Sequence, residues 1–149
     1  MGGSIFIAML AAVFLWWFST GAILLIVRLM ENHSRSAKLK VCIFGLPILA
    51  VGLWGIWETS SSLTILGSYL AFVSAIFVWG WIELTFLTGV ITGPNKSQCP
   101  KNIPLFEKFI RAWGTLAYHE VSLLLALGLV ICLAHGQENH FGIWTFTVL

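Results

Sequence analysis

All eight Lys and Arg residues of this 149-residue chain lie in two short segments, and the sequence around those segments is almost entirely apolar. The segments contain Arg28, Arg35, Lys38 and Lys40, and then Lys96, Lys101, Lys108 and Arg111. Only 9% of the residues are charged, whereas a soluble domain carries about 25%. The pattern predicts a polytopic membrane protein and excludes an ordinary soluble domain.

Four apolar stretches are long enough to cross a bilayer, because a hydrocarbon core of about 30 Å needs roughly 20 helical residues. We predict an all-α fold, one transmembrane helix bundle with spans at residues 4–27, 41–57, 63–91 and 112–134. Pro47 should bend the second span, because its ring removes a backbone hydrogen bond. Residues 141–149 resemble the start of a fifth span, so we expect the sequence to be incomplete at Leu149; the alternative is an interfacial end.

Residues 103–113 form an amphipathic segment before the fourth span. Their apolar side chains recur at helical spacing, with Glu107, Lys108 and Arg111 between them. This arrangement predicts a helical turn that lies in the membrane interface.

The distribution of positive charge predicts the orientation of the chain. The turns at residues 58–62 and 135–140 contain no Lys or Arg, whereas the other two connections contain all of them. Because Lys and Arg accumulate in cytoplasmic loops, we expect both basic connections in the cytoplasm and the N-terminus outside. The basic residues should touch anionic lipid headgroups, at about 1 kcal/mol each, rather than nucleic acid.

Glu83 and the neighbours His119 and Glu120 are ionisable residues within the predicted spans. A carboxylate near the centre of a membrane helix costs at least about 2.5 kcal/mol on insertion scales, so it needs a partner or a role. Glu83 lies eight residues before Ile91, and His119 lies eight residues after Arg111, so each is about 12 Å inward along its helix. Because the two spans are consecutive and antiparallel, we expect Glu83 and His119 to meet.

These residues belong to a predicted intramembrane polar cluster of Glu83, Thr115, His119, Glu120 and Ser122, three of which share one face of the fourth span. A hydrogen-bonded structural cluster is the favoured interpretation. A contact between His119 and a pigment or lipid, and catalysis, are the alternatives. One His and two Glu are few ligands for a metal centre, and adjacent helical residues point about 100° apart, so His119 and Glu120 cannot both face one metal ion without help. We therefore predict no metal centre and no catalytic residue.

Two further patterns have structural interpretations. Gly67, Ala71 and Ala75 form a row of small residues that allows close helix approach, within the chain or, as the alternative, at a subunit interface. The cysteines, Cys42, Cys99 and Cys132, contain no CxxC pair, which argues against a disulfide framework or a thiolate metal site.

Uncommon runs of residues occur along the whole chain: WWFSTG at 16–21, AFVSA at 71–75, WGWIE at 79–83, FLTG at 86–89, TGP at 92–94, YHE at 118–120 and WTF at 144–146. In these runs the chain resembles the bacterial photosynthetic complex assembly proteins often called PuhE. Members of that family continue with further hydrophobic spans. One position departs from the pattern, because Ile82 stands where the family has a His before the glutamate. The departure weakens a catalytic interpretation.

The resemblance implies an assembly factor or accessory integral-membrane subunit of a reaction centre–light-harvesting complex in purple-type phototrophic bacteria. The implied partners are reaction-centre and antenna polypeptides and membrane lipids, in the bacterial cytoplasmic (inner or intracytoplasmic) membrane. Aromatic side chains could stack on bacteriochlorophyll or a carotenoid, with His119 as the candidate pigment contact. Two alternatives are a membrane-embedded metal- or pigment-dependent enzyme that uses Glu83, His119 and Glu120, and a transporter with Glu83 as proton carrier.

Overall fold

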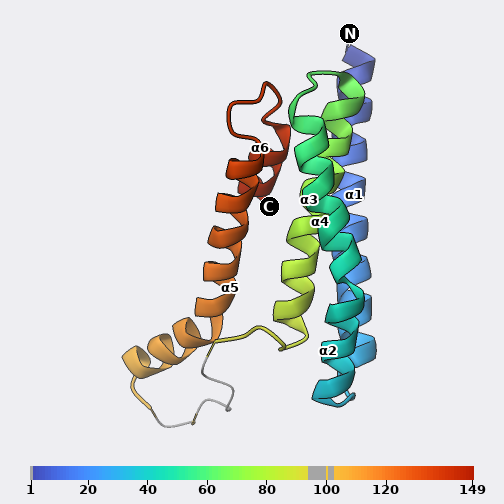
Figure 1. The fold of residues 1–149 in the computed structure, drawn as a ribbon. Helices are drawn as coiled ribbons and strands as arrows, with labels where there is room; N and C mark the ends of the chain where they lie inside the picture. Colours follow the sequence, from blue (N-terminus) through green and yellow to red (C-terminus); the bar gives the residue numbers. More distant parts are fainter. Residues whose placement is uncertain (1, 94–99, 101–102) are drawn as a thin grey trace.

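The computed structural model describes residues 2–93, 100 and 103–149, and the regular secondary structure in these ranges is helical. The helices, shown in Figure 1, are α1 (Gly2–Met30), α2 (Arg35–Phe44), α3 (Leu46–Ser60), α4 (Ile65–Leu87), α5 (Leu105–Leu133) and α6 (Phe141–Val148). In the described part of the chain, four helical stretches are long and apolar enough to cross a membrane: Ile5–Met30, Arg35–Ser60, Ile65–Leu87 and Leu105–Leu133. They follow the order of the predicted spans.

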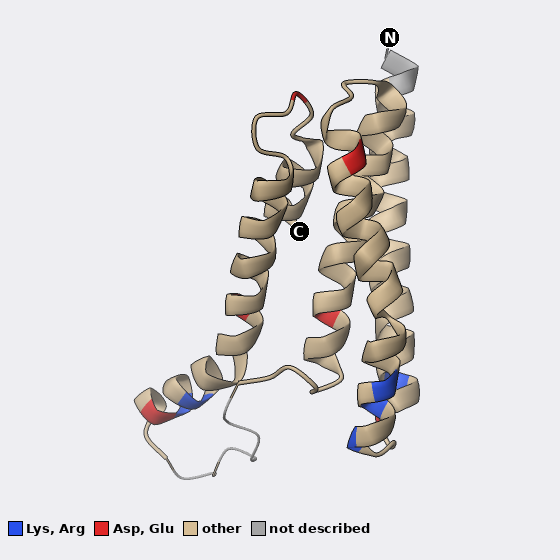
Figure 2. Cartoon of the chain, in the orientation of Figure 1, with Lys and Arg blue, Asp and Glu red and all other residues tan. Residues whose placement is uncertain are grey.

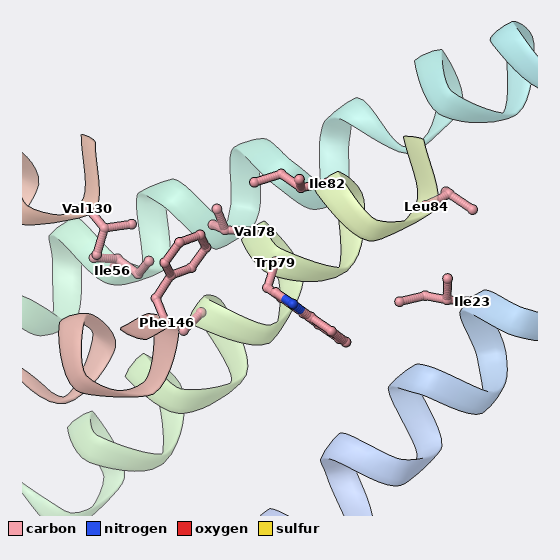
Figure 3. Close-up of a cluster of buried hydrophobic side chains, with 9 residues drawn as sticks. Ile23, Ile56, Val78, Trp79, Ile82, Leu84, Val130 and Phe146 are labelled. Atoms are coloured by element: carbon pink, nitrogen blue, oxygen red, sulfur yellow. The ribbon is translucent and has the colours of Figure 1, made fainter. Parts of the chain in front are cut away.

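Helix α4 is the centre of the bundle, because α1, α3, α5 and α6 all pack against it. Ala71 and Ala75 are 2% and 0% exposed, so the row of small residues serves packing within the chain. The apolar core, most of it drawn in Figure 3, consists of Ile23, Ile56, Ala75, Val78, Trp79, Ile82, Leu84, Val130 and Phe146. Because lipid tails are as apolar as these side chains, close packing rather than escape from water holds such helices together.

Helices α3 and α4 approach each other closely at Gly52. A Cβ atom at this position would lie 2.8 Å from the carbonyl oxygen of Ser74 and 3.0 Å from the side chains of Phe77 and Val78. Any larger residue would therefore push α3 away from α4.

The second membrane-length stretch is interrupted at Gly45, where α2 ends and α3 begins. Pro47 lies in the first turn of α3, where its missing N–H interrupts the backbone ladder. The distortion predicted from Pro47 therefore takes the form of a helix break. Next to this break, the indole N–H of Trp81 donates a hydrogen bond to the carbonyl oxygen of Cys42 over 3.0 Å.

Helix α4 ends at Leu87, which is four residues short of the predicted end of the third span at residue 91. Gly89 has a φ of +77°, and the backbone N–H groups of Val90 and Ile91 both donate to the carbonyl oxygen of Thr85 over 3.0 Å. A left-handed glycine is a common helix terminator, because glycine adopts this conformation at little cost.

Helix α5 joins the predicted amphipathic segment and the predicted fourth span into one helix. Figure 1 shows that its first turns run at a steep angle to the rest of the helix. The apolar side chains of these turns are exposed: Leu105, Phe106, Phe109, Ile110 and Trp113. Glu107 and Arg111 form an ion pair over 2.9 Å on the same turns. An exposed apolar face beside an ion pair suits the interfacial position that the sequence predicts.

The described Lys and Arg residues gather at one end of the bundle, as Figure 2 shows. Those of α1 and α2 lie at the lower ends of these helices in that view, and those of α5 lie in its first turns, at a similar level. We call this the basic end. Lys96 and Lys101, which belong to the second basic segment, lie outside the described residues. In a bundle of antiparallel spans, the first and third connections lie at the same end, and these are the two connections that contain the Lys and Arg residues.

Candidate polar site between α4 and α5

Glu83 of α4 and His119 of α5 lie within hydrogen-bonding distance, with 3.1 Å between Oε1 and Nε2. Their side chains are 18% and 10% exposed. The structure thus brings together the two residues that the antiparallel order of the helices places at one level.

Phe86 fixes the plane of the His119 ring. The two rings stack with 4.2 Å between their centroids and 29° between their planes. Phe86 follows Glu83 by three residues, so both side chains project from the same face of α4. On the other edge of the imidazole, Nδ1 lies 3.9 Å from a carboxylate oxygen of Glu120, whose side chain is 60% exposed. Both ring nitrogens of His119 therefore face carboxylates.

The hydrogen-bonding atoms of Glu83 and His119 determine which residue donates and which accepts. An ionised carboxylate can only accept hydrogen bonds, so with Glu83 ionised the Nε2 atom of His119 carries the hydrogen and donates it. If the imidazole is also protonated at Nδ1, the pair has no net charge. Mutual neutralisation and a hydrogen bond both lower the cost of keeping a carboxylate away from water.

A backbone contact holds α5 beside the end of α4. The N–H of Gly93 donates to the carbonyl oxygen of Thr115 over 2.9 Å, one helical turn before His119. A Cβ atom on Gly93 would overlap the carbonyl group of Gly114. The connection after α4 can therefore approach α5 this closely only with glycine, and this approach sets His119 opposite Glu83.

The pair lies nearer to the end of α4 than the sequence suggested. Because α4 ends at Leu87, Glu83 is four residues, or about 6 Å, from the end of its helix rather than about 12 Å. The error comes from the turn at Gly89, which the hydropathy pattern does not show. The pair therefore belongs to the part of the bundle close to the basic end.

The other members of the predicted cluster have different surroundings. The hydroxyl of Thr115 donates to the carbonyl oxygen of Arg111 over 3.0 Å, and the hydroxyl of Ser122 donates to that of Tyr118 over 2.7 Å. Ser and Thr in helices commonly bond to the carbonyl four residues earlier. The side-chain hydrogen bond that the structure shows across the α4–α5 interface joins Glu83 to His119.

The pair supplies one imidazole and one carboxylate as possible metal ligands. Among the described residues, no three His, Cys, Asp or Glu side chains converge as a metal site would require, and protein zinc sites use at least three such ligands. Ile82, at the position where the resembling family has His, is 5% exposed and packs in the apolar core. Ligation of a pigment magnesium by Nε2 of His119 would require Glu83 to move.

Asn139, in the turn at residues 135–140, is a structural residue that sequence reasoning missed. It is 2% exposed. Its amide group donates to the carbonyl oxygens of Thr59 (3.0 Å) and Ser62 (2.9 Å), and its Oδ1 accepts from the N–H of Phe141 (3.0 Å). One sequence feature could have indicated this role: Asn139 lies two residues before the first residue of an apolar segment. Asn side chains commonly form a hydrogen bond with the backbone of the residue two positions later.

No solved structure matches this chain. An uncharacterised 30.4 kDa protein in the puhA 5′ region of Rhodobacter capsulatus is 44% identical over 140 residues, which are 94% of this chain and 51% of that relative. The chain thus spans about half the length of this relative. A family model described as a protein of unknown function, DUF3623, matches residues 3–149. The chain therefore belongs to the DUF3623 family.

Proposed function

We propose that this chain acts as an assembly factor or accessory integral-membrane subunit of a bacterial photosynthetic complex, the reaction centre with its light-harvesting antenna. The relative in Rhodobacter capsulatus carries the proposal, because its description places it 5′ of puhA, in a photosynthesis gene region. The identity of 44% covers 94% of this chain. The resemblance to the PuhE proteins points to the same role, with reaction-centre and antenna polypeptides as partners.

The location that we propose is the bacterial cytoplasmic membrane, with the basic end in the cytoplasm. The four membrane-length helical stretches support a multi-pass protein. The gathering of the described Lys and Arg residues at one end supports the orientation.

The outer surface of α1 offers contacts for neighbouring helices or pigments. Phe14 stacks on Phe18 with 6.0 Å between ring centroids and lies 6.2 Å from the ring of Trp17. The three side chains are 56%, 59% and 66% exposed. Such a row of rings can pack against a carotenoid, a bacteriochlorophyll tail or the helix of another subunit.

A deletion strain of a phototrophic bacterium that carries the gene tests this role. We expect the near-infrared absorption of reaction centres and antenna in its membranes to fall, and a plasmid copy to restore it. The tagged protein should co-purify with reaction-centre or antenna polypeptides in mild detergent. Normal complexes in the deletion strain, together with recovery of the tagged protein alone, would refute the proposal.

The geometry of His119 supports one alternative, a membrane-embedded enzyme with pigment or lipid as substrate. A carboxylate that orients an imidazole is the arrangement in which His acts as a general base, and Glu83 holds His119 in that way. For an enzyme, His119→Gln should abolish product formation while the folded protein accumulates normally. Unchanged pigment and lipid composition in that variant would remove the alternative.

A further inference from the structure

A pocket of about 390 Å³ lies at the basic end, among the C-terminal end of α1, the first turns of α2 and the end of α4. Its lining residues are Leu24, Val27, Arg28, Glu31, Lys38, Leu87 and Thr88. Two cations from different helices, Arg28 and Lys38, thus border one cavity that contains a single acid, Glu31. The pocket has a net positive charge.

Neither cation of this pocket forms an ion pair with the described residues. Within residues 2–93, 100 and 103–149, the side-chain ion pairs involve Arg111 and His119 as the cationic partners. Neither Arg28 nor Lys38 has a carboxylate oxygen within ion-pair distance in that part of the chain. An anion in the pocket would therefore find two cationic donors that are not held in ion pairs by the described carboxylates.

The remaining walls of the pocket are apolar. Leu24 and Val27 of α1 and Leu87 of α4 line it, and the hydroxyl of Thr88 is turned back to donate to the carbonyl oxygen of Leu84 over 2.6 Å. The ligand that fits such a site has an anionic group beside an apolar body.

Deeper in the bundle, the same two long helices offer an apolar path. A second groove, of about 380 Å³, lies between α1 and α4 and is lined almost entirely by apolar side chains, among them Ile26 and Leu84. These two residues precede Val27 and Leu87 of the charged pocket by one and three positions, so the groove begins within one helical turn of it. The cationic pocket thus lies close to an apolar groove between α1 and α4.

We propose that the pocket binds the headgroup of one anionic phospholipid from the leaflet at the basic end. Its phosphate oxygens accept hydrogen bonds from the guanidinium of Arg28 and the ammonium of Lys38. Its acyl chains lie along the apolar side chains of α1 and α4. Basic pockets between transmembrane helices are known to select anionic headgroups, because the apolar walls strengthen the charge interaction.

The lipid would join two helices that have little direct contact. Helices α1 and α2 both pack on α4 rather than on each other, and the pocket lies between them. A phosphate held by Arg28 and Lys38 would fix α2 relative to α1 and stabilise this end of the bundle.

The test compares two variants that each lose two positive charges from the same basic segment. Arg28→Gln with Lys38→Gln removes the cations of the pocket. Arg35→Gln with Lys40→Gln removes the same charge from positions that do not line it. Each protein is reconstituted in nanodiscs of phosphatidylcholine, with or without phosphatidylglycerol, and thermal unfolding and lipid retention by native mass spectrometry are measured. Inorganic phosphate added to phosphatidylcholine nanodiscs is a separate arm.

We expect phosphatidylglycerol to raise the unfolding temperature of the wild type and of the Arg35/Lys40 control, and to be retained by both. The Arg28/Lys38 variant should lose the shift and bind phosphatidylglycerol at least tenfold more weakly. Equal losses in the two variants would overturn the proposal, because they would indicate diffuse surface attraction. Stabilisation by inorganic phosphate alone would also overturn it and indicate a free-anion site, and so would a wild type that does not respond to phosphatidylglycerol.

Discussion

The imidazole Nε2 of His119 lies 3.1 Å from the Oε1 atom of Glu83, and this hydrogen bond links α5 to the central helix α4. Both side chains are more than four-fifths buried. The two residues are therefore the place where a small chemical change should most affect the position of α5.

Replacing His119 by Leu should destabilise the protein more than replacing Glu83 by Gln. The Leu side chain leaves the Glu83 carboxylate without its donor, at a cost of about 1–3 kcal/mol. The Gln side chain keeps a hydrogen-bonding group opposite His119 and removes the charge, so its cost should stay near the 0.6 kcal/mol or so that is typical of polar contacts between membrane helices. Unfolding in detergent micelles measures both. Equal destabilisation by the two variants would show that the carboxylate does not depend on His119.

Gly93→Ala should loosen the attachment of α5. The added Cβ would overlap the carbonyl group of Gly114, and overpacking of this kind costs about 1–3 kcal/mol. Gly128→Ala is the matched control on α5, because a Cβ there would meet nothing within 4 Å, and it should leave stability unchanged or raise it by up to about 1 kcal/mol, since Ala favours the helix more than Gly. The free energy of unfolding in micelles measures both changes. A Gly93→Ala protein as stable as the control would contradict the close approach of the connection to α5.

Asn139→Ala should release α6 from the bundle. The substitution leaves the carbonyl oxygens of Thr59 and Ser62 without their side-chain donor, at a cost of about 1–3 kcal/mol for buried groups. Hydrogen exchange of the α6 amides should accelerate accordingly. His140→Ala, at an exposed neighbouring position, should leave the exchange unchanged. If both variants exchange at the wild-type rate, Asn139 does not anchor α6.

Reporter fusions should place the basic end in the cytoplasm. We expect fluorescence from green fluorescent protein fused after Ser34 or Lys108, and activity of alkaline phosphatase fused after Ser62 or Gln137. The physical reason is the retention of Lys and Arg on the cytoplasmic side during insertion. Fusions after Ser34 and Lys108 that report opposite sides would contradict the topology.

The sequence was informative about the elements whose signals are local. Runs of apolar residues predicted membrane-length helices, and their antiparallel order predicted the contact between Glu83 and His119. The end of α4 was misplaced because hydropathy continues through Val90 and Ile91, while the chain turns at Gly89. Hydropathy measures how a residue partitions into lipid and does not report its backbone conformation.

For the other site residues, the sequence could predict local features but not the contacts between helices. Thr115, His119 and Ser122 all lie on α5, but helical periodicity could not show that the two hydroxyls bond to their own helix. Phe86 was recognisable as a neighbour of Glu83 on one helix face, yet its stacking on His119 depends on how α5 is placed. Asn139 is buried by segments almost eighty residues away in sequence. Such contacts are decided by tertiary packing.

The buried amide of Asn139 has a consequence for biosynthesis. Its acceptors, at Thr59 and Ser62, leave the ribosome well before Asn139 itself, so the α3–α4 hairpin can be in place when the later turn arrives. The hairpin then provides a prepared docking point, and α6 can take its position as soon as that turn forms. Insertion in chain order would thus by itself direct α6 to its site.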